Sequence, residues 1–585
     1  MKKFFFAFIT LAVVLAAVVF PHSAAMAASG VKLNKTNFPD SNFLKVLSGK
    51  DCDRNKDGTL SKGEIEKITI LNLSDRGIKT LKGIEFFTSL VELECFSNKL
   101  TELDVSGNLK LELLYCGGNL LERIDVSKNV SLTSIECVRG KLKNLDISYN
   151  VNLKDLQCDE NELTALDVRS NKELKTLLCS ENMLTKLDLS KNSKLENLNC
   201  AYNPIAKLDL SKNSKLKDLF CRGTGLKKLD VSKNKRLWSL NISFTNISKI
   251  DISKNTKLEN FNCSNSKLRE FDVGKNLELR ELTCDNIYLT KLDVTKNKKL
   301  TTLICNNNKL TNLNLSKNKK ITSLYCSDNS LKKLNVREMK NLLYLGCDST
   351  RLTSLDVSKN AKLSILNCEG NELTGLDVSN NKELQNLFCG YNKLNTLKLP
   401  RSKMLTFIRC DDNKLNALYI GKIPKLQELL CANNKIKSLN LTKNTELLYL
   451  FCNGNRLASL DLSKNTKIEI LDCSNNKLKT LNTGTSTIKT FLRCEGNPLT
   501  TLSAKYKGKT IKAKVKGLGT LGVRMGSIET GRDTEKGNFY VEAVPAKGSK
   551  FSGWEKSSSV ISTKPKYILT AGKAYDVVAR FKSVK

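Results

Sequence analysis

Cysteine recurs along this 585-residue chain at a fixed interval of 21 residues. One interval is doubled to 42 residues, and Ile242 stands at its midpoint. A period of this length is typical of a solenoid, in which each repeat forms one coil and buries its apolar face only against neighbouring coils. The nineteen cysteines of this series lie at positions 95, 116, 137, 158, 179, 200, 221, 263, 284, 305, 326, 347, 368, 389, 410, 431, 452, 473 and 494.

The repeat reads LxxLxCxxNxLxxLDVSxNxx, starts at Leu90 and recurs 20 times, after a 22-residue copy that starts at Ile68. Apolar residues occupy positions 1, 4, 6, 11, 14 and 16, and the alternation around positions 4 and 6 predicts a short strand. Asn at position 9, such as Asn98, is expected to bond backbone groups of adjacent coils. The Asp and Ser of LDVS, such as Asp104, are expected to cap a turn.

The cysteines form a column in such a stack, one per coil. Parallel strands lie roughly 4.8 Å apart and their Cβ atoms keep that spacing, whereas a disulfide needs about 3.5–4.5 Å between Cβ atoms. The number of cysteines in the column is odd, and Ile242 fills the same position without a thiol. We therefore expect a packed column of reduced, buried thiols. A disulfide framework and a metal or redox store remain the alternatives.

The first residues, 1–27, predict a secretory signal peptide that ends in Ala25-Met26-Ala27, an A-x-A cleavage site. An uncleaved membrane anchor is the alternative, and no later segment is apolar for long enough to span a bilayer. No sortase-type sorting signal precedes the C-terminus. The mature chain is expected to be secreted, or held at the cell wall by non-covalent contacts.

The formal charge is +37, which favours anionic partners such as wall polymers, although solubility alone is the simpler reason for so many lysines. The only histidine is His22, within the predicted signal peptide, so the mature chain has no imidazole for catalysis or metal binding. The recurring Asp residues, such as Asp104, fit turn capping better than catalysis. We therefore expect that the protein is not an enzyme.

Residues 28–67 predict a helical cap that contains one EF-hand-like loop. Oxygen-bearing side chains stand at loop positions 1, 3, 5, 9 and 12, Gly58 at position 6 and Leu60 at position 8. The loop predicts a structural calcium site, and a loop that serves only as a cap is the alternative. Cys52 beside it lies outside the column, and its thiol is either reactive or buried. The predicted calcium ligands are Asp53, Asn55, Asp57, Thr59 (through its carbonyl), Ser61 and Glu64.

The repeats resemble the leucine-rich repeat family over residues 68–502, and the cysteine at a strand position is similar to the internalin J type of bacterial surface protein. The resemblance implies a curved solenoid with a parallel β-sheet, an irregular, turn-rich convex side and a concave sheet that binds other macromolecules. Residues 503–585 hold 18 Lys and Arg against 6 Asp and Glu. Their YVEAVPAKGSKFSGW segment resembles the B-repeat modules of internalins, which implies a small β-rich domain acting as a wall-contacting unit or a cap.

Positions 3, 5, 7 and 8 of each repeat are expected on the concave face, because their parity excludes them from the core. Exposed aromatic residues flanked by arginine are typical of a binding site, although strands favour aromatics even without a ligand. A smaller group comprises Phe96, Tyr115, Tyr202, Phe220 and Phe244. The predicted ligand-binding residues are Tyr325, Tyr344, Phe388, Tyr391, Phe407, Arg409, Tyr449, Phe451, Phe491 and Arg493.

These features predict an exported protein that binds a protein or glycan on its concave face, in a role such as adhesion or host interaction. The alternative is a structural protein of the cell wall or matrix, held there by its basic charge. We expect a monomer with calcium as its only cofactor, and no nucleic acid partner for an exported chain.

Overall fold

The computed structural model describes residues 30–506, 509–516, 519–525, 540–547, 549–556, 559–568 and 575–583. The predicted signal peptide, residues 1–27, lies outside the described residues. The chain divides into two compact units, Met1–Ile287 and Tyr288–Lys585, which are described separately. Within the described residues, no helix is both long and apolar enough to cross a membrane.

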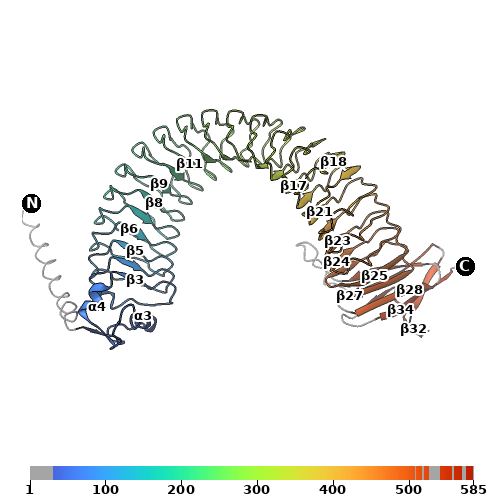
Figure 1. Ribbon diagram of the computed structural model, residues 1–585, viewed down its shortest axis with the longest axis horizontal. Coiled ribbons are helices and arrows are strands. Elements are labelled where there is room, and N and C mark those ends of the chain that lie inside the picture. Colours follow the sequence, from blue (N-terminus) through green and yellow to red (C-terminus); the bar gives the residue numbers. More distant parts are fainter. Residues whose placement is uncertain are drawn as a thin grey trace, which may run out of the picture. The chain divides into compact units, whose positions relative to one another are not determined.

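Unit 1 begins with a helical segment and continues as a stack of coils (Figure 1). The strands β1 (Val31–Lys32) and β2 (Thr59–Leu60) pair antiparallel, and the helices α3 (Ser41–Leu47) and α4 (Lys62–Lys67) flank the predicted loop. The 3-10 helix η1 (Ile84–Phe86) follows the first strand of the stack. The parallel strands of unit 1 are β3 (Ile70–Asn72), β4 (Glu92–Glu94), β5 (Leu113–Tyr115), β6 (Ser134–Glu136), β7 (Asp155–Gln157), β8 (Thr176–Leu178), β9 (Asn197–Asn199), β10 (Asp218–Phe220), β11 (Ser239–Asn241), β12 (Asn260–Asn262) and β13 (Glu281–Thr283).

Unit 2 continues the same repeat, with each strand at positions 3 to 5 and each strand residue paired to the residue 21 positions later. A second short parallel pair, β18 (Gly375–Asp377) and β20 (Thr396–Lys398), forms at positions 13 to 15. The strands of the main stack are β14 (Thr302–Ile304), β15 (Ser323–Tyr325), β16 (Tyr344–Gly346), β17 (Ile365–Asn367), β19 (Asn386–Phe388), β21 (Phe407–Arg409), β22 (Glu428–Leu430), β23 (Tyr449–Phe451), β24 (Ile470–Asp472) and β26 (Phe491–Arg493).

The C-terminal segment of unit 2 is β-rich and extends the solenoid through hydrogen-bonded strands. The strand β26 pairs with β29 (Gly519–Met525), which pairs with β30 (Tyr540–Pro545), and β30 pairs with β33 (Lys566–Ile568). Residue 503, the predicted start of the C-terminal module, lies inside β27, so solenoid and module share a strand. The other sheet has the order β25 (Thr480–Ile488), β27 (Thr501–Tyr506), β28 (Lys509–Lys516), β34 (Tyr575–Ser583), β31 (Ser549–Lys556) and β32 (Ser559–Ser562).

All cysteines of the column are buried, and none of them is in a disulfide. Burial raises the pKa of the Cys200 thiol to about 12, so the thiolate that would react or bind a metal is not formed at neutral pH. The expected column of reduced thiols is therefore what the structure shows. Cys52 is also buried. Its burial and, to a smaller extent, the negative charge of the nearby Asp51 raise its pKa to about 11. Of the two alternatives for Cys52, the structure has the buried thiol.

Asn at position 9 links neighbouring coils, as predicted. Asn98 donates from Nδ2 to the Leu73 carbonyl at 2.8 Å and the Cys95 carbonyl at 3.0 Å, and its Oδ1 accepts from the Ile78 amide at 2.9 Å. The Asp of LDVS caps its turn, since Asp104 Oδ1 accepts from the Ser106 amide at 2.9 Å. The same contacts recur in most coils that have Asn at position 9 and Asp at position 15.

A second asparagine ladder, at position 19, was not predicted. Asn213 is fully buried, and its Nδ2 donates to the carbonyls of Leu189 at 3.2 Å and Asn192 at 2.9 Å, both in the preceding coil. Its Oδ1 has no hydrogen-bond partner, and the same holds for Asn192 and Asn234. The ladder therefore ties each coil to the one before it, while the acceptors of these amides stay unused.

Candidate ligand-binding face

The side chains at positions 3, 5, 7 and 8 form what we call the strand face. In β9, Asn197 and Asn199 are half-buried whereas Leu198 between them is fully buried, and most of the other strands of the stack alternate in the same way. The predicted parity of the repeat is therefore correct. Positions 3 and 5 turn outward, and positions 7 and 8 follow directly after the strand.

The strand face of unit 2 brings most of the predicted ligand-binding residues together. The rings of Phe388 and Phe407, from the neighbouring strands β19 and β21, lie 4.8 Å apart between centroids. Tyr325 and Tyr344 lie on the adjacent strands β15 and β16. Tyr449 and Phe451 lie together on β23 and are half-buried. We call this set the unit 2 aromatic band; it comprises Tyr325, Tyr344, Phe388, Phe407, Tyr449 and Phe451.

Phe491 was predicted to be exposed on this face, and the prediction is wrong. Only 4 % of its surface is accessible. Phe491 lies on β26, which pairs with β29 of the C-terminal segment instead of a further coil. The end of the stack is thus covered, and position 3 is part of the core there.

Arg409 lies within a cluster that already contains its counter-ions. Its Nε lies 2.9 Å from Asp411 Oδ1 and 3.2 Å from Glu369 Oε1, and its Cζ lies 5.2 Å from the centroid of the Tyr391 ring. A Cβ on Gly390 would come within 2.8 Å of Asp411 Oδ1, so glycine leaves the room that this carboxylate occupies. We call these residues the Arg409 cluster. Burial raises the pKa of Asp411 and of Glu369.

Position 8 has a left-handed backbone in every 21-residue coil, with φ between 51° and 69°. Asn, Asp and Gly tolerate this conformation, whereas a bulky side chain is strained by it. Three coils nevertheless carry an aromatic residue there, namely Tyr202, Phe244 and Tyr391. Positive φ at a bulky residue persists where surrounding contacts enforce it and is concentrated at functional sites.

Sequence reasoning missed Arg222, which lies at position 7 between two of these aromatics. Its Cζ lies 5.4 Å from the centroid of the Tyr202 ring and 4.6 Å from that of Phe244. We call these three residues the Arg222 cluster. The two flanking aromatics had been noted in the sequence, but nothing in the repeat showed that one guanidinium would stack between rings from the coils on either side.

The strand face is acidic although the chain is basic. Its twenty coils place no lysine at positions 3, 5, 7 or 8, and eighteen carboxylates against four arginines give a formal charge of −14. The lysines therefore belong to the other surfaces of the coils. The carboxylates are Glu92, Glu94, Glu136, Asp155, Asp159, Glu160, Glu181, Asp218, Glu281, Asp285, Asp328, Asp348, Glu369, Asp411, Asp412, Glu428, Asp472 and Glu495, and the arginines are Arg139, Arg222, Arg409 and Arg493.

The predicted calcium loop lies between α3 and α4, as an EF-hand loop lies between its helices. Asp53 is buried and its Oδ1 has no hydrogen-bond partner, which fits a cation ligand. Glu64 instead accepts hydrogen bonds from the Arg54 amide at 2.8 Å and the Ser61 amide at 2.9 Å. The hydrogen bond from the Ser61 hydroxyl is the largest of several that lower the pKa of Glu64 to about 2.

Glu64 thereby forms a capping box at the start of α4. Among the described residues, no three His, Cys, Asp or Glu side chains gather as a metal site. The other predicted ligands bond within the loop, Asn55 Nδ2 donating to Asp57 Oδ2 at 2.8 Å and the Thr59 amide to Asp57 Oδ1 at 2.8 Å. The unpartnered Oδ1 of Asp53 thus supports calcium binding, whereas the capping box of Glu64 supports a loop that serves only as a cap. Calcium binding therefore stays a prediction.

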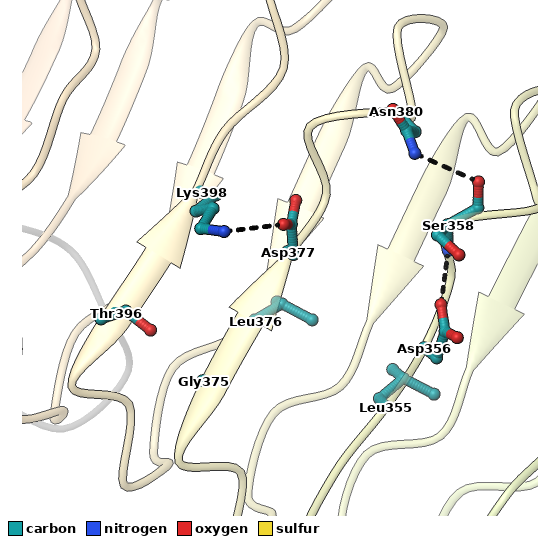
Figure 2. A pocket seen from close by; sticks show the side chains of 9 residues that line it. All are labelled: Leu355, Asp356, Ser358, Gly375, Leu376, Asp377, Asn380, Thr396 and Lys398. Carbon is teal, nitrogen blue, oxygen red and sulfur yellow. Dashed lines mark hydrogen bonds and ion pairs between the residues drawn. The ribbon is translucent and has the colours of Figure 1, made fainter.

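A shallow hollow of about 400 Å³ opens at positions 13 to 18, away from the strand face (Figure 2). Gly375 on β18 leaves the space, and Lys398 beside it lies 3.2 Å from Asp377. Asn380 and Ser358 are bonded to each other at 3.5 Å. No predicted ligand-binding residue lines the hollow, and its one cation is already paired.

No family model matches the chain, and no curated protein matches it. Among solved structures, the functional domain of InlJ from Listeria monocytogenes, which includes a cysteine ladder, aligns at 32 % identity with a TM-score of 0.57 and covers 61 % of this chain and 79 % of that chain.

Two more distant structures show the fold alone. YopM from Yersinia enterocolitica is 21 % identical (TM-score 0.53; 76 % of this chain and 91 % of that chain), and a TDR receptor is 18 % identical (TM-score 0.56; 74 % and 86 %). A solenoid of this kind is a scaffold for interactions with other proteins. The chain belongs to the leucine-rich repeat family with a cysteine ladder, of which InlJ is a member.

Proposed function

We propose that the protein is exported and binds a macromolecular partner through the unit 2 aromatic band. The observation that carries this proposal is the placement of six aromatic side chains on the outward side of five strands within one run of seven, where they are not needed in the core. Phe388 and Phe407 stack at 4.8 Å and keep part of their surface accessible. Clustered aromatic side chains of this kind supply most of the binding energy in protein interfaces.

The charges beside the band favour a partner that is basic next to its apolar surface. Asp348, Glu369 and Asp411 occupy position 7 along the band, and Asp328 and Asp412 occupy position 8. No lysine interrupts this acidic row. Complementary charge around an apolar centre directs association and excludes partners of the wrong sign.

The test compares binding of the mature protein and its variants to mucin, epithelial cells and bacterial walls. Tyr344→Ala, Phe388→Ala and Phe407→Ala together should abolish binding that persists at high salt, because apolar contacts are not screened. Tyr419→Ala is the matched control, since Tyr419 is an aromatic residue with 82 % of its surface exposed, but at position 15. Loss of binding in the Tyr419 variant alone would contradict the proposal.

The second candidate is a structural protein that adheres to the anionic cell wall. A charge of +37 on a chain with an acidic strand face concentrates the lysines on its other surfaces, which supports this role. Attachment would then fall steeply as salt rises and would not change in the triple variant. Salt-sensitive attachment that the triple variant retains would identify the lysine-bearing surfaces, and not the aromatic band, as the functional site.

Calcium binding in the cap is proposed separately, on the unpartnered Oδ1 of Asp53. Asp53, Asn55, Asp57, Ser61 and Glu64 would supply the side-chain oxygens. A ligand that binds only the folded state raises its stability, so calcium should raise the melting temperature of the wild type and not that of Asp53→Ala. An equal melting temperature with and without calcium would leave the loop a cap only.

A further inference from the structure

Arg222 is the one strand-face arginine without an internal counter-ion. Arg139 lies 3.0 Å from Glu160, Arg409 pairs with Asp411, and Arg493 pairs with Glu495. Arg222 forms no ion pair with any described residue, and its Nε is buried without a hydrogen-bond partner. An unsatisfied donor on a cation is costly, and the terminal N–H groups of Arg222, which are not buried with Nε, are the part of the guanidinium that a ligand can reach.

The aromatic residues that hold Arg222 are themselves strained. Tyr202 and Phe244 have φ of 52° and 57°, at a position where most other coils carry Asn, Asp, Gly or Ser. Their rings are nevertheless 45 % and 49 % exposed, so they contribute little to the core. Gly223, between them, leaves the space for the Tyr202 ring, since a Cβ there would lie 2.6 Å from Tyr202 Cδ1. The cluster is therefore built at the expense of local stability.

We propose that the Arg222 cluster binds the single carboxylate of an otherwise neutral oligosaccharide. A guanidinium held between two rings presents its remaining N–H groups to one planar anion, and a carboxylate accepts them in a bidentate pair. Phe220, on the adjoining strand β10, adds a partly exposed ring on which a sugar can stack.

The polar side chains next to the cluster suit sugar hydroxyl groups. Asn241 and Asn262 accept amide protons of Ser243 and Ser264 through Oδ1, at 3.0 Å in both cases. Their Nδ2 groups donate to nothing among the described residues and remain available. Neutral amides beside one cation match a ligand that has many hydroxyl groups and one charge.

The charge of the surrounding surface excludes a polyanion. Within unit 1 the strand face has ten carboxylates and two arginines, of which Arg139 is paired, and no lysine. A chain with several negative charges, such as an acidic peptide or nucleic acid, would be repelled along its length. One isolated carboxylate that reaches Arg222 is compatible with this field.

The experiment measures equilibrium binding of 3′-sialyllactose, with lactose as the uncharged counterpart and acetyl-Ala-Ala-Glu-Ala-Ala-amide as a peptide with one carboxylate. We expect 3′-sialyllactose to bind the wild type at least tenfold more tightly than either. Arg222→Gln should weaken binding at least tenfold, and Arg222→Lys should weaken it as well, because lysine cannot form the bidentate pair. Arg139→Gln is the matched control and should bind like the wild type.

Tyr202→Asn and Phe244→Asn separate ligand binding from folding. Asn tolerates the left-handed backbone, so both variants should melt within a few degrees of the wild type while binding falls at least tenfold. Equal binding of lactose, equal or tighter binding of the peptide, unchanged binding by Arg222→Gln, or no measurable binding of 3′-sialyllactose would each overturn the proposal.

Discussion

The Arg409 cluster and the Arg222 cluster both combine an arginine with an aromatic side chain, but only the Arg409 cluster contains acidic counter-ions. Each has an arginine on the strand face stacked on an aromatic side chain whose backbone is left-handed. In unit 2 the guanidinium is neutralised by Asp411 and Glu369, whereas in unit 1 no carboxylate of the described residues reaches it. The first cluster is complete by itself, and the second is open to a ligand.

The difference arises from position 7 of the coil. Arg409 is at position 5. Asp411 occupies position 7 of the same coil and Glu369 occupies position 7 two coils earlier, with Gly390 at that position in the coil between them. Arg222 occupies position 7 itself, and the residues at that position on either side are Ala201 and Ser243. Single residues at one position of a repeat thus decide whether an arginine stabilises the scaffold or is available for binding.

Removal of the arginine should have the largest effect in unit 2. Arg409→Gln leaves the buried Asp411 without its cation and should lower the free energy of unfolding by about 2 kcal/mol, which is less than for a fully buried pair because a third of Arg409 is exposed. Arg222→Gln should change it by less than about 0.5 kcal/mol, as for surface substitutions. Urea unfolding of both variants measures the difference, and equal losses would mean that the two clusters do not differ in this way.

Acid should partly rescue the Arg409→Gln variant. Burial raises the pKa of Asp411 and Glu369 in the folded state, so the folded protein binds protons that the unfolded chain does not. Stability from this source increases as the pH falls through the raised pKa values towards the ordinary value of about 4. The urea midpoint of the Arg409→Gln variant should therefore lie closer to that of the wild type at pH 5 than at pH 7. A loss that is the same at both pH values would assign the effect to packing.

A new carboxylate should convert the open cluster into a paired one. Ala201→Asp places an acid at position 7 in the coil before Arg222, as Asp159 and Asp411 do in their coils. The ion pair should stabilise the fold by about 0.5 kcal/mol and prevent binding of 3′-sialyllactose. Ala201→Asn, of the same shape but without charge, serves as the control and should still bind.

The smallest expected effect concerns the strained aromatics. Phe244→Asn loses a half-exposed ring and relieves the left-handed backbone, so its free energy of unfolding should stay within about 0.5 kcal/mol of the wild type. Tyr391→Asn also loses the stack on a paired arginine and should be less stable by about 1 kcal/mol. Thermal melts of the two variants measure this order, and the opposite order would contradict the assignment of structural and open clusters.

The sequence predicted the features that every repeat shares. Position 4 was expected to be apolar, Asn98 to bond backbone groups and Asp104 to cap a turn. These roles could be predicted because every coil packs on its neighbours through the same positions of the repeat. The column of reduced thiols followed from the strand spacing, the odd number of cysteines and the presence of Ile242 at the same position. Internalin-like ancestry was likewise visible in the 21-residue unit with its cysteine.

The departures from the repeat depend on neighbours that a sequence does not place. Phe491 is buried because the stack ends beneath β29, and Arg409 is paired because Gly390 lets two carboxylates approach. Arg222 was overlooked because its partners come from two other coils. The role of Asn213 depends on the path of the preceding coil, whose Leu189 and Asn192 carbonyls accept from its Nδ2.

The most direct test of the comparison follows the Nε–Hε signals of Arg222 and Arg409 by NMR in 15N-arginine-labelled protein. The two signals are assigned by their loss in Arg222→Lys and Arg409→Lys. On addition of 3′-sialyllactose, we predict that the Arg222 signal shifts and the Arg409 signal does not. A shift of Arg409 with Arg222 unmoved would contradict the account, because the paired arginine would then be the one that meets the ligand.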